Sequence, residues 1–254
     1  MAPVNSNNRQ SAQSESPCKI CGNKSVLYGV VDFNKNCEEQ RGKYLPLSGR
    51  PVYYYQCGTC SLVFTTAFDK WSKSEFIEHI YNEGYIEVDP GYLEERPASN
   101  ARLVSNFVKH QKELHILDYG GGNGRLSEIL NANGFHTKSW DPMDSSATRP
   151  DSGKFYVVTA FEVFEHTPTP IETFVEATEF LNNDGVLLFS TLTIDNLPPR
   201  ACYFWYISPR NGHITIFTKR SLKILAEKFG YRIHHMTKGL HLAYRQPPAW
   251  LKRG

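Results

Sequence analysis

Two pairs of cysteines near the N-terminus have the spacing of a metal site. Cys18 and Cys21 form one CxxC turn, and Cys57 and Cys60 form a second, with 35 residues between the pairs. Each turn can direct two thiolates to one ion, and two turns complete a tetrahedral zinc site. Four protein ligands leave no position for substrate or water, so we expect this zinc to be structural. The alternative is a set of unrelated reduced thiols, and Cys37 is expected on an inserted loop between the pairs.

A glycine-rich stretch at 120–124 follows a short apolar run and precedes a helical pattern. In that context glycines let the backbone approach a nucleotide-type ligand. The spacing is GxGxG, with Arg125 at the place where a dinucleotide fingerprint has its third glycine. Asp118 precedes the glycines, where a carboxylate repels a pyrophosphate but suits a ligand with a cationic amino group and sulfonium. With Asp141 placed to bind ribose hydroxyls, the pattern favours S-adenosylmethionine over NAD.

Two histidines are the candidate catalytic bases, because neutral imidazole is available near pH 7. His166 follows the strand expected at 155–160, on the side where a doubly wound sheet binds ligands. The alternative roles for His166 are helix capping and support of a neighbouring site residue. His213 lies in the long connection before the last helix, where its alternative role is to hold that loop in place. Transfer of a methyl group from S-adenosylmethionine needs an aligned nucleophile and, where that nucleophile carries a proton, a group that accepts it.

Aromatic and polar side chains on both sides of the glycine loop are candidate contacts for the methyl acceptor. Tyr81, Tyr85, Tyr92 and Arg96 precede the loop and are expected to form a lid. The aromatic run that starts at Tyr203 offers faces for stacking on a sugar or a base. Simple packing is the alternative role for each of these residues. The candidate acceptor contacts are Tyr85, Arg96, Tyr203, Trp205, Tyr206 and Asn211.

Alternating strand and helix patterns must position these residues. Apolar runs predict strands at 115–119, 135–140, 155–160 and 186–192. Strands that alternate with helices imply an α/β fold with a Rossmann-like, doubly wound and mostly parallel sheet. Two closing strands, at 231–237 and 240–244, predict an antiparallel C-terminal hairpin.

The chain divides by composition into five parts. Residues 1–17 are polar and have almost nothing to bury, so we expect a disordered leader. The parts that follow are expected to be a zinc-binding module at 18–66, a helical linker or lid at 67–112, a Rossmann-like domain at 113–246 and a tail at 247–254.

Composition disfavours several classes of partner. The 254 residues are 40% hydrophobic and 21% charged, as in an ordinary globular protein. A net charge of +2 gives no case for nucleic acid, which demands a strongly basic face. The N-terminus lacks the features of a signal peptide, and no apolar run is long enough for a membrane span. We therefore expect a cytoplasmic protein with reduced cysteines and a small-molecule substrate.

Three motifs together resemble those of the class I S-adenosylmethionine-dependent methyltransferases. Residues 117–124 resemble their first motif, 140–142 their acidic ribose-binding position, and 161–166 the segment after their fourth strand. The four-cysteine start and the 211–218 stretch resemble zinc-containing methyltransferases of sugar pathways. That narrower resemblance implies a nucleotide-linked or polysaccharide sugar as acceptor, and the similarity covers about residues 18–244.

The resemblance implies that the cofactor contacts come from the glycine loop and from two strand ends. These positions are Asp118, Tyr119, Gly120, Gly122, Asn123, Gly124, Asp141, Pro142, Met143, Ala160, Phe161 and Glu162. The family normally has a helix, a third strand and an adenine-contacting acidic residue before the 155–160 strand. Only 14 residues lie from Asp141 to Lys154, so we expect that strand to be absent or shortened.

The sequence therefore predicts an S-adenosylmethionine-dependent methyltransferase of a small polar acceptor, with a sugar preferred, and with structural Zn²⁺. Two alternatives stay open. An NAD-linked sugar oxidoreductase is disfavoured by Arg125 and Asp118. A non-catalytic zinc-ribbon interaction protein would have no need for Asp118, Asp141 and His166 together.

Overall fold

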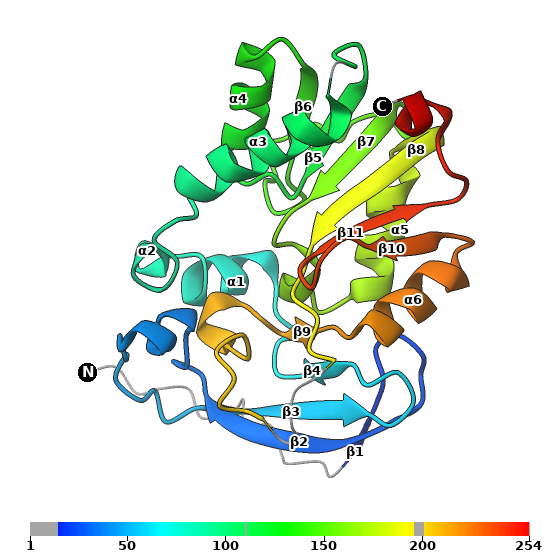
Figure 1. The fold of residues 1–254 in the computed structure, drawn as a ribbon. Helices are drawn as coiled ribbons and strands as arrows, with labels where there is room; N and C mark the ends of the chain where they lie inside the picture. Colours follow the sequence, from blue (N-terminus) through cyan, green and yellow to red (C-terminus); the bar gives the residue numbers. More distant parts are fainter. Residues whose placement is uncertain (1–14, 110, 196–200, 254) are drawn as a thin grey trace.

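Two β-sheets organise the chain, and the computed structural model describes residues 15–109, 111–195 and 201–253. In Figure 1 the larger sheet occupies the upper part of the molecule and the smaller sheet lies below it. Residues 1–14 of the leader predicted at 1–17 fall outside the described residues. Among the described helices, none combines the length and the apolar character that crossing a membrane requires.

The larger sheet is mostly parallel and has the strand order β10-β11-β8-β7-β5-β6. Its parallel strands are β5 (His115–Tyr119), β6 (His136–Trp140), β7 (Phe155–Ala160) and β8 (Leu181–Ser190). Its antiparallel strands are β10 (Arg232–His235) and β11 (Leu240–Tyr244), of which β11 joins the sheet at β8. The predicted Rossmann-like sheet with an antiparallel C-terminal hairpin is therefore confirmed.

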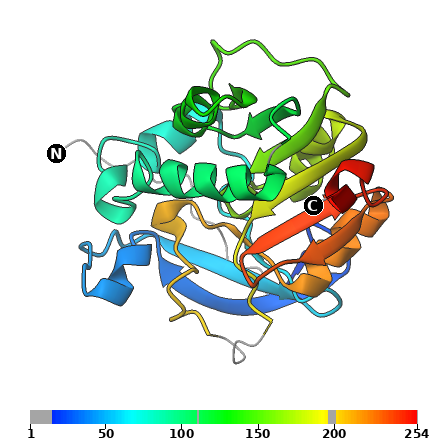
Figure 2. The same ribbon diagram turned by 45° about the horizontal axis from the view of Figure 1, so that its top comes forward.

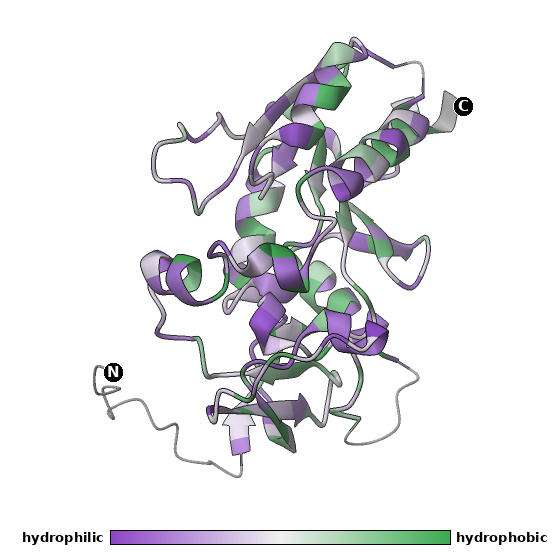
Figure 3. Ribbon diagram, turned by 90° about the vertical axis from the view of Figure 1, so that its left-hand side faces the viewer, coloured by the Kyte–Doolittle hydropathy of each residue, from purple (hydrophilic) through white to green (hydrophobic). Residues whose placement is uncertain are grey.

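Helices cover both faces of the larger sheet. One face is covered by α3 (Glu95–Val108) and α4 (Arg125–Ala132), the other by α5 (Pro170–Glu179) and α6 (Lys219–Lys228). In β5, Ile116 packs with α3 and α4 and Leu117 packs with α5 and α6, as expected for a strand buried on both sides. The helices carry both hydrophobic and hydrophilic residues, because each has one buried and one exposed face (Figure 3).

The short connection between β6 and β7 leaves β6 at the edge of the sheet. The described residues 141–154 contain neither helix nor strand, which confirms the expected loss of the third strand. A parallel crossover needs a dozen or more residues for its helix alone, and 14 residues cannot supply both a helix and a strand. The side of β6 that a third strand would cover is consequently free of any described strand.

The smaller sheet is antiparallel and has the order β1-β2-β3-β4-β9. Its strands are β1 (Glu15–Pro17), β2 (Lys24–Asp32), β3 (Pro51–Cys57), β4 (Val63–Thr65) and β9 (Thr215–Ile216). Figure 2 shows the long strands of this sheet running beneath the rest of the molecule.

Two features of the smaller sheet differ from the predicted boundaries. Residues 15–17, expected as the end of a disordered leader, pair with β2, because backbone hydrogen bonding does not depend on apolar side chains. The last strand, β9, comes from the far part of the chain and pairs with β4. The module at 18–66 is therefore completed by residues that follow the larger sheet's central strands.

Short helical segments lie in the connections within and between the two sheets. They are η1 (Cys37–Arg41), α1 (Lys73–His79), α2 (Tyr85–Val88), η2 (Phe164–His166) and η3 (Pro209–Asn211), with η4 (Ala249–Arg253) at the C-terminal end. Helix α1 begins with a capping box, in which Ser72 accepts from the Glu75 amide and Glu75 accepts from the Ser72 amide. A shared apolar cluster joins β3, α1, α2 and the segment before β9.

Candidate functional site

A cavity of about 460 Å³ lies at the carboxyl ends of β5, β6 and β7. Its walls come from the glycine loop, the residues that follow β6 and β7, and the segment from α1 to the start of α3. Doubly wound sheets bind ligands at this edge, and the volume suits a small molecule. The predicted cofactor positions all line this cavity except Gly124, which precedes α4, and Ala160, which is buried in β7.

The glycine loop needs its glycines for two separate reasons. Gly120, Gly122 and Gly124 have φ values of 70°, 52° and 75°, in the left-handed region that favours glycine. A Cβ on Gly121 would lie 2.2 Å from Oγ of Ser139 and 2.4 Å from Oδ2 of Asp118. The backbone of Gly121 therefore lies so close to the Asp118 carboxylate that a residue with a Cβ would not fit there without a shift.

Asp118 is a buried carboxylate in the wall of the cavity. The Thr159 hydroxyl donates to its Oδ1 at 2.9 Å. Burial raises the pKa of Asp118 to about 7, the Thr159 hydrogen bond opposes this rise, and the negative charge of Asp141 adds to it. A cationic ligand beside this carboxylate would stabilise its ionised form.

Asp141 joins the end of β6 to the glycine loop. Its Oδ2 accepts from the Gly122 amide at 2.9 Å, and its Oδ1 accepts from the Met143 amide at 2.7 Å. Arg125 points away from the cavity, since its guanidinium donates to Glu94 and Glu128 on the surface.

The opposite wall is aromatic and also carries an ion pair. Tyr81, Tyr85 and Tyr92 pack edge to face, with ring centroids 5.3 and 5.1 Å apart, and all three line the cavity. Arg96 donates to both carboxylate oxygens of Asp89, at 2.8 and 2.6 Å. Of the predicted acceptor contacts, Tyr85 and Arg96 therefore reach the cavity.

The other predicted acceptor contacts lie outside the cavity lining. Tyr203 is 76% exposed to solvent, and Trp205 is half-buried beside Tyr206. Tyr206 is buried, and its hydroxyl donates to Glu165. Asn211 is also buried, where it donates to the Val88 carbonyl and accepts from the Cys37 amide. Sequence reasoning did not single out Asp89, Phe76 or Asn100, which do line the cavity.

Four titratable side chains meet at the back of the cavity, with one ligand-type atom of each within 4.8 Å of the others. We call this set the Glu/His cluster; it consists of Glu162, Glu165, His166 and His213. Glu162 and His166 line the cavity, whereas Glu165 and His213 are buried behind them. The Glu165 carbonyl accepts from the Ile214 amide at 2.8 Å, which brings the two distant segments together.

Both imidazoles of the cluster have a partner at Nδ1. In His213 this atom lies 2.9 Å from the Tyr206 carbonyl, and in His166 it lies 3.2 Å from the Tyr81 hydroxyl. Burial lowers the pKa of His213 to about 4 and holds the pKa of His166 well below its ordinary value. Both rings are therefore neutral near pH 7.

The two carboxyl groups of the cluster are held differently. Ser190 donates to Oε1 of Glu162 at 3.0 Å, and the Glu162 backbone has a φ of 55°, which is uncommon for a residue with a side chain. Glu165 is fully buried, and burial together with repulsion from Glu162 raises its pKa to about 8. Within the described residues, Oε2 of Glu165 has no hydrogen-bond partner.

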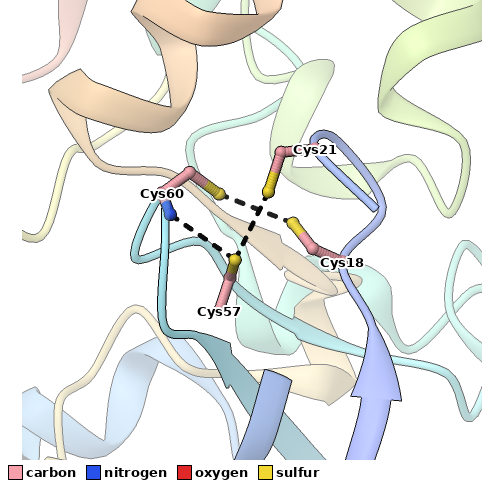
Figure 4. A group of neighbouring side chains, drawn as sticks. All are labelled: Cys18, Cys21, Cys57 and Cys60. Atoms are coloured by element: carbon pink, nitrogen blue, oxygen red, sulfur yellow. Dashed lines mark hydrogen bonds between the residues drawn. The ribbon is translucent and has the colours of Figure 1, made fainter. Parts of the chain in front are cut away.

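The four predicted metal ligands converge beside the smaller sheet (Figure 4). Their Sγ atoms lie within 4.8 Å of one another, with Cys18 to Cys60 and Cys21 to Cys57 both at 3.5 Å. Thiolates about 2.3 Å from one zinc ion lie about 3.8 Å apart, so the donor set and its size fit zinc. Cys37 lies apart from this cluster, with its Sγ 3.8 Å from Nδ1 of His213.

Comparison with known proteins identifies the family. A family model described as a methyltransferase domain matches residues 92–236, which is more than half of the chain. The chain therefore belongs to the methyltransferase domain family and is an S-adenosylmethionine-dependent methyltransferase. The NAD-linked and non-catalytic alternatives are set aside. No curated protein matches the sequence.

Solved structures of methyltransferases are similar to this chain at low sequence identity. The Burkholderia thailandensis 1,6-didemethyltoxoflavin-N1-methyltransferase is 12% identical, with a TM-score of 0.51 over 79% of this chain and 96% of that chain. A Thermotoga maritima S-adenosylmethionine-dependent methyltransferase is 14% identical, with a TM-score of 0.45 over 69% of this chain and 100% of that chain. At this identity the likeness to the Burkholderia protein concerns the fold alone.

Proposed function

We propose that this methyltransferase acts on a small polar acceptor, and that the acceptor is a sugar. The proposal rests chiefly on one observation: a single cavity joins the glycine loop and Asp118 to a wall of tyrosines that also carries Arg96. Aromatic faces suit the apolar faces of a sugar ring, and the ion pair of Arg96 with Asp89 offers polar atoms for its hydroxyls.

The residues around the glycine loop fit S-adenosylmethionine. The close backbone approach at Gly121, the buried Asp118 and the Asp141 carboxylate suit a ligand with a cationic amino group and ribose hydroxyls. When bound, the cofactor supplies a methyl carbon that its sulfonium already activates. The protein then has to align the acceptor with that carbon, exclude water and accommodate the acceptor's proton.

His166 is the residue that we expect to influence the acceptor's proton. It lines the cavity and is neutral near pH 7, whereas His213 lies behind it with ring centroids 4.9 Å apart. We therefore assign His213 a positioning role. The tyrosines enclose the acceptor side, which limits access of water to the reacting atoms.

The cofactor assignment can be tested by calorimetry on the zinc-loaded chain, with S-adenosylhomocysteine and NAD titrated in parallel. We expect micromolar binding of the first and none of the second. A screen with radiolabelled S-adenosylmethionine then compares nucleotide-linked sugars and oligosaccharides with small amines and phenols. Methylation confined to amines or phenols would refute the sugar assignment and leave the cofactor assignment intact.

We also propose that the four cysteines bind one structural zinc ion. Four thiolates close the coordination shell, so this zinc takes no part in catalysis. The site requires reduced thiols, which agrees with the expected cytoplasmic location. Mass spectrometry under native conditions should find one zinc per chain. A metal-free chain after expression with ample zinc would contradict this proposal.

A further inference from the structure

The Glu/His cluster has the donor atoms of a second, different metal site. Its two carboxylates and two imidazoles each place one ligand atom within 4.8 Å of the others. Ligand atoms about 2.1 Å from one ion lie about 3 to 4 Å apart, so small side-chain movements would bring all four onto one ion. Carboxylates combined with imidazoles suit first-row divalent ions such as Mn²⁺, Fe²⁺ and Zn²⁺.

An unpaired buried oxygen points independently to a ligand in this place. Glu165 has 0% exposure, and across the described part of the chain its Oε2 finds no hydrogen-bond partner. A buried carboxylate oxygen without a partner is costly, whereas a bound cation would satisfy it directly. The other carboxylate, Glu162, sits in a strained left-handed backbone conformation, and such strain gathers at functional sites.

Each member of the cluster is oriented by a partner outside it, as ligands of protein-bound metals are. The Tyr206 hydroxyl donates to Oε1 of Glu165, and Ser190 donates to Oε1 of Glu162. Nδ1 of His213 faces the Tyr206 carbonyl, and Nδ1 of His166 faces the Tyr81 hydroxyl. Each imidazole contributes one ring nitrogen to the cluster.

We propose that the Glu/His cluster binds one divalent transition-metal cation at the back of the methyl-transfer cavity. Glu162 and His166 line the cavity, so an ion can enter through it and an acceptor atom can reach the ion. The four ligands leave further coordination positions of a six-coordinate ion for the acceptor. The site thus differs from the cysteine site, whose shell is closed.

The role of the ion rests on the proposed function and narrows it to oxygen methylation. A divalent cation lowers the pKa of a hydroxyl that binds to it. That hydroxyl releases its proton to water, and its oxygen forms the bond to the methyl carbon. The bond from this carbon to sulfur breaks at the same time, and sulfur keeps the electron pair. A sugar with neighbouring hydroxyls would bind the ion through two oxygens. In this arrangement His166 acts on the acceptor's proton through the ion.

The binding test uses Mn²⁺ and electron paramagnetic resonance on the full, zinc-loaded chain after dialysis against a weak chelator. Free Mn²⁺ gives a sharp spectrum that is lost on binding, and the soft thiolates of the cysteine site do not favour this ion. We expect one bound Mn²⁺ per chain. Glu165→Gln should weaken Mn²⁺ binding at least about tenfold, and Glu162→Gln provides a second test in case the first variant folds poorly.

Glu172→Gln is the matched control, because this glutamate is exposed on α5 and lies outside the cluster. It should leave Mn²⁺ binding unchanged. Calorimetry with S-adenosylhomocysteine on every variant tests whether the fold and the cofactor site are intact, independently of Mn²⁺ binding. Two results would overturn the metal proposal: an unaltered chain that binds S-adenosylhomocysteine normally but binds no Mn²⁺, or Mn²⁺ binding that both cluster variants retain. If the unaltered chain does not bind S-adenosylhomocysteine, that result would instead contradict the proposed function.

Discussion

The cysteine site and the Glu/His cluster are two groupings of metal-type ligands that are built in opposite ways. The cysteines come from two local turns that the smaller sheet brings together, and four soft donors close the shell. The cluster joins the segment after β7 to His213, and it opens onto the cavity through Glu162 and His166. If both proposals hold, the first site stabilises a small sheet, whereas the second lies beside the reacting atoms.

The largest expected effect separates the two sites by stability. Cys57→Ser should abolish zinc binding and unfold the smaller sheet, because metal binding coupled to folding is worth on the order of 10 kcal/mol. Cys202→Ser is the control, since this thiol lies outside the cysteine cluster. Native mass spectrometry and calorimetric melting measure the effect. Full stability of a zinc-free Cys57→Ser chain would show that the smaller sheet holds itself together.

The second-largest expected effect is on cofactor affinity and concerns Asp118. Asp118→Asn should weaken S-adenosylhomocysteine binding at least about thirtyfold without changing zinc content, since it removes the buried carboxylate that we propose faces the ligand's amino group. Thr159→Val, which removes only the hydroxyl that donates to Asp118, should have a smaller effect. Equal affinities for the unaltered chain and Asp118→Asn would remove Asp118 from the cofactor site.

The pH dependence of binding gives a second measurement on the same carboxyl. Because the pKa of Asp118 is raised to about 7, much of it is protonated below neutral pH in the free protein. A cationic ligand prefers the ionised form, so affinity should rise between about pH 6 and pH 8 and binding should release a proton. Calorimetry in buffers of different ionisation enthalpy measures that proton. Asp118→Asn should lose both the pH dependence and the proton release.

The sequence predicted those parts of the sites whose residues lie close together in the chain. The cysteine turns and the 118–124 loop are continuous in the chain, so residue types and intervals were enough to indicate both. The strands β5, β6 and β7 were likewise predicted from apolar runs that the structure confirms nearly to the residue. The absence of a third strand was predicted because the 14 residues from 141 to 154 are too few for both a helix and a strand.

Contacts between distant segments could not be predicted in the same way. The pairing of β9 with β4 and the hydrogen bond from the Ile214 amide to the Glu165 carbonyl bring His213 to His166. Neither contact leaves a periodic signal in the sequence. Glu165 falls within the 161–166 motif, but its burial depends on this packing and has no signal in the sequence. Asp89 belongs to no sequence motif, so the sequence did not identify it as a residue of the cavity.

A backbone change tests the cofactor loop with a smaller effect. Gly121→Ala places a methyl group against the Ser139 hydroxyl and the Asp118 carboxylate, so one of them must move. We expect about tenfold weaker S-adenosylhomocysteine binding and about 1–3 kcal/mol lower stability. Gly239→Ala is the control, because a Cβ there meets nothing within 4 Å. Unchanged binding in Gly121→Ala would mean that the loop can shift freely.

The smallest expected effect concerns the two groups of tyrosines proposed from sequence to face the acceptor. Tyr203→Phe should leave kcat and KM unchanged within about twofold, because this side chain is 76% exposed and lies outside the cavity lining. Tyr85→Phe removes a hydroxyl that donates to Asp89 inside the cavity, so KM for the acceptor should rise several-fold. Steady-state kinetics on the acceptor found in the screen would measure both. A larger effect from Tyr203→Phe than from Tyr85→Phe would place the acceptor against the loop before β9. The acceptor would then not lie between the glycine loop and α2, and the proposed acceptor site would be wrong.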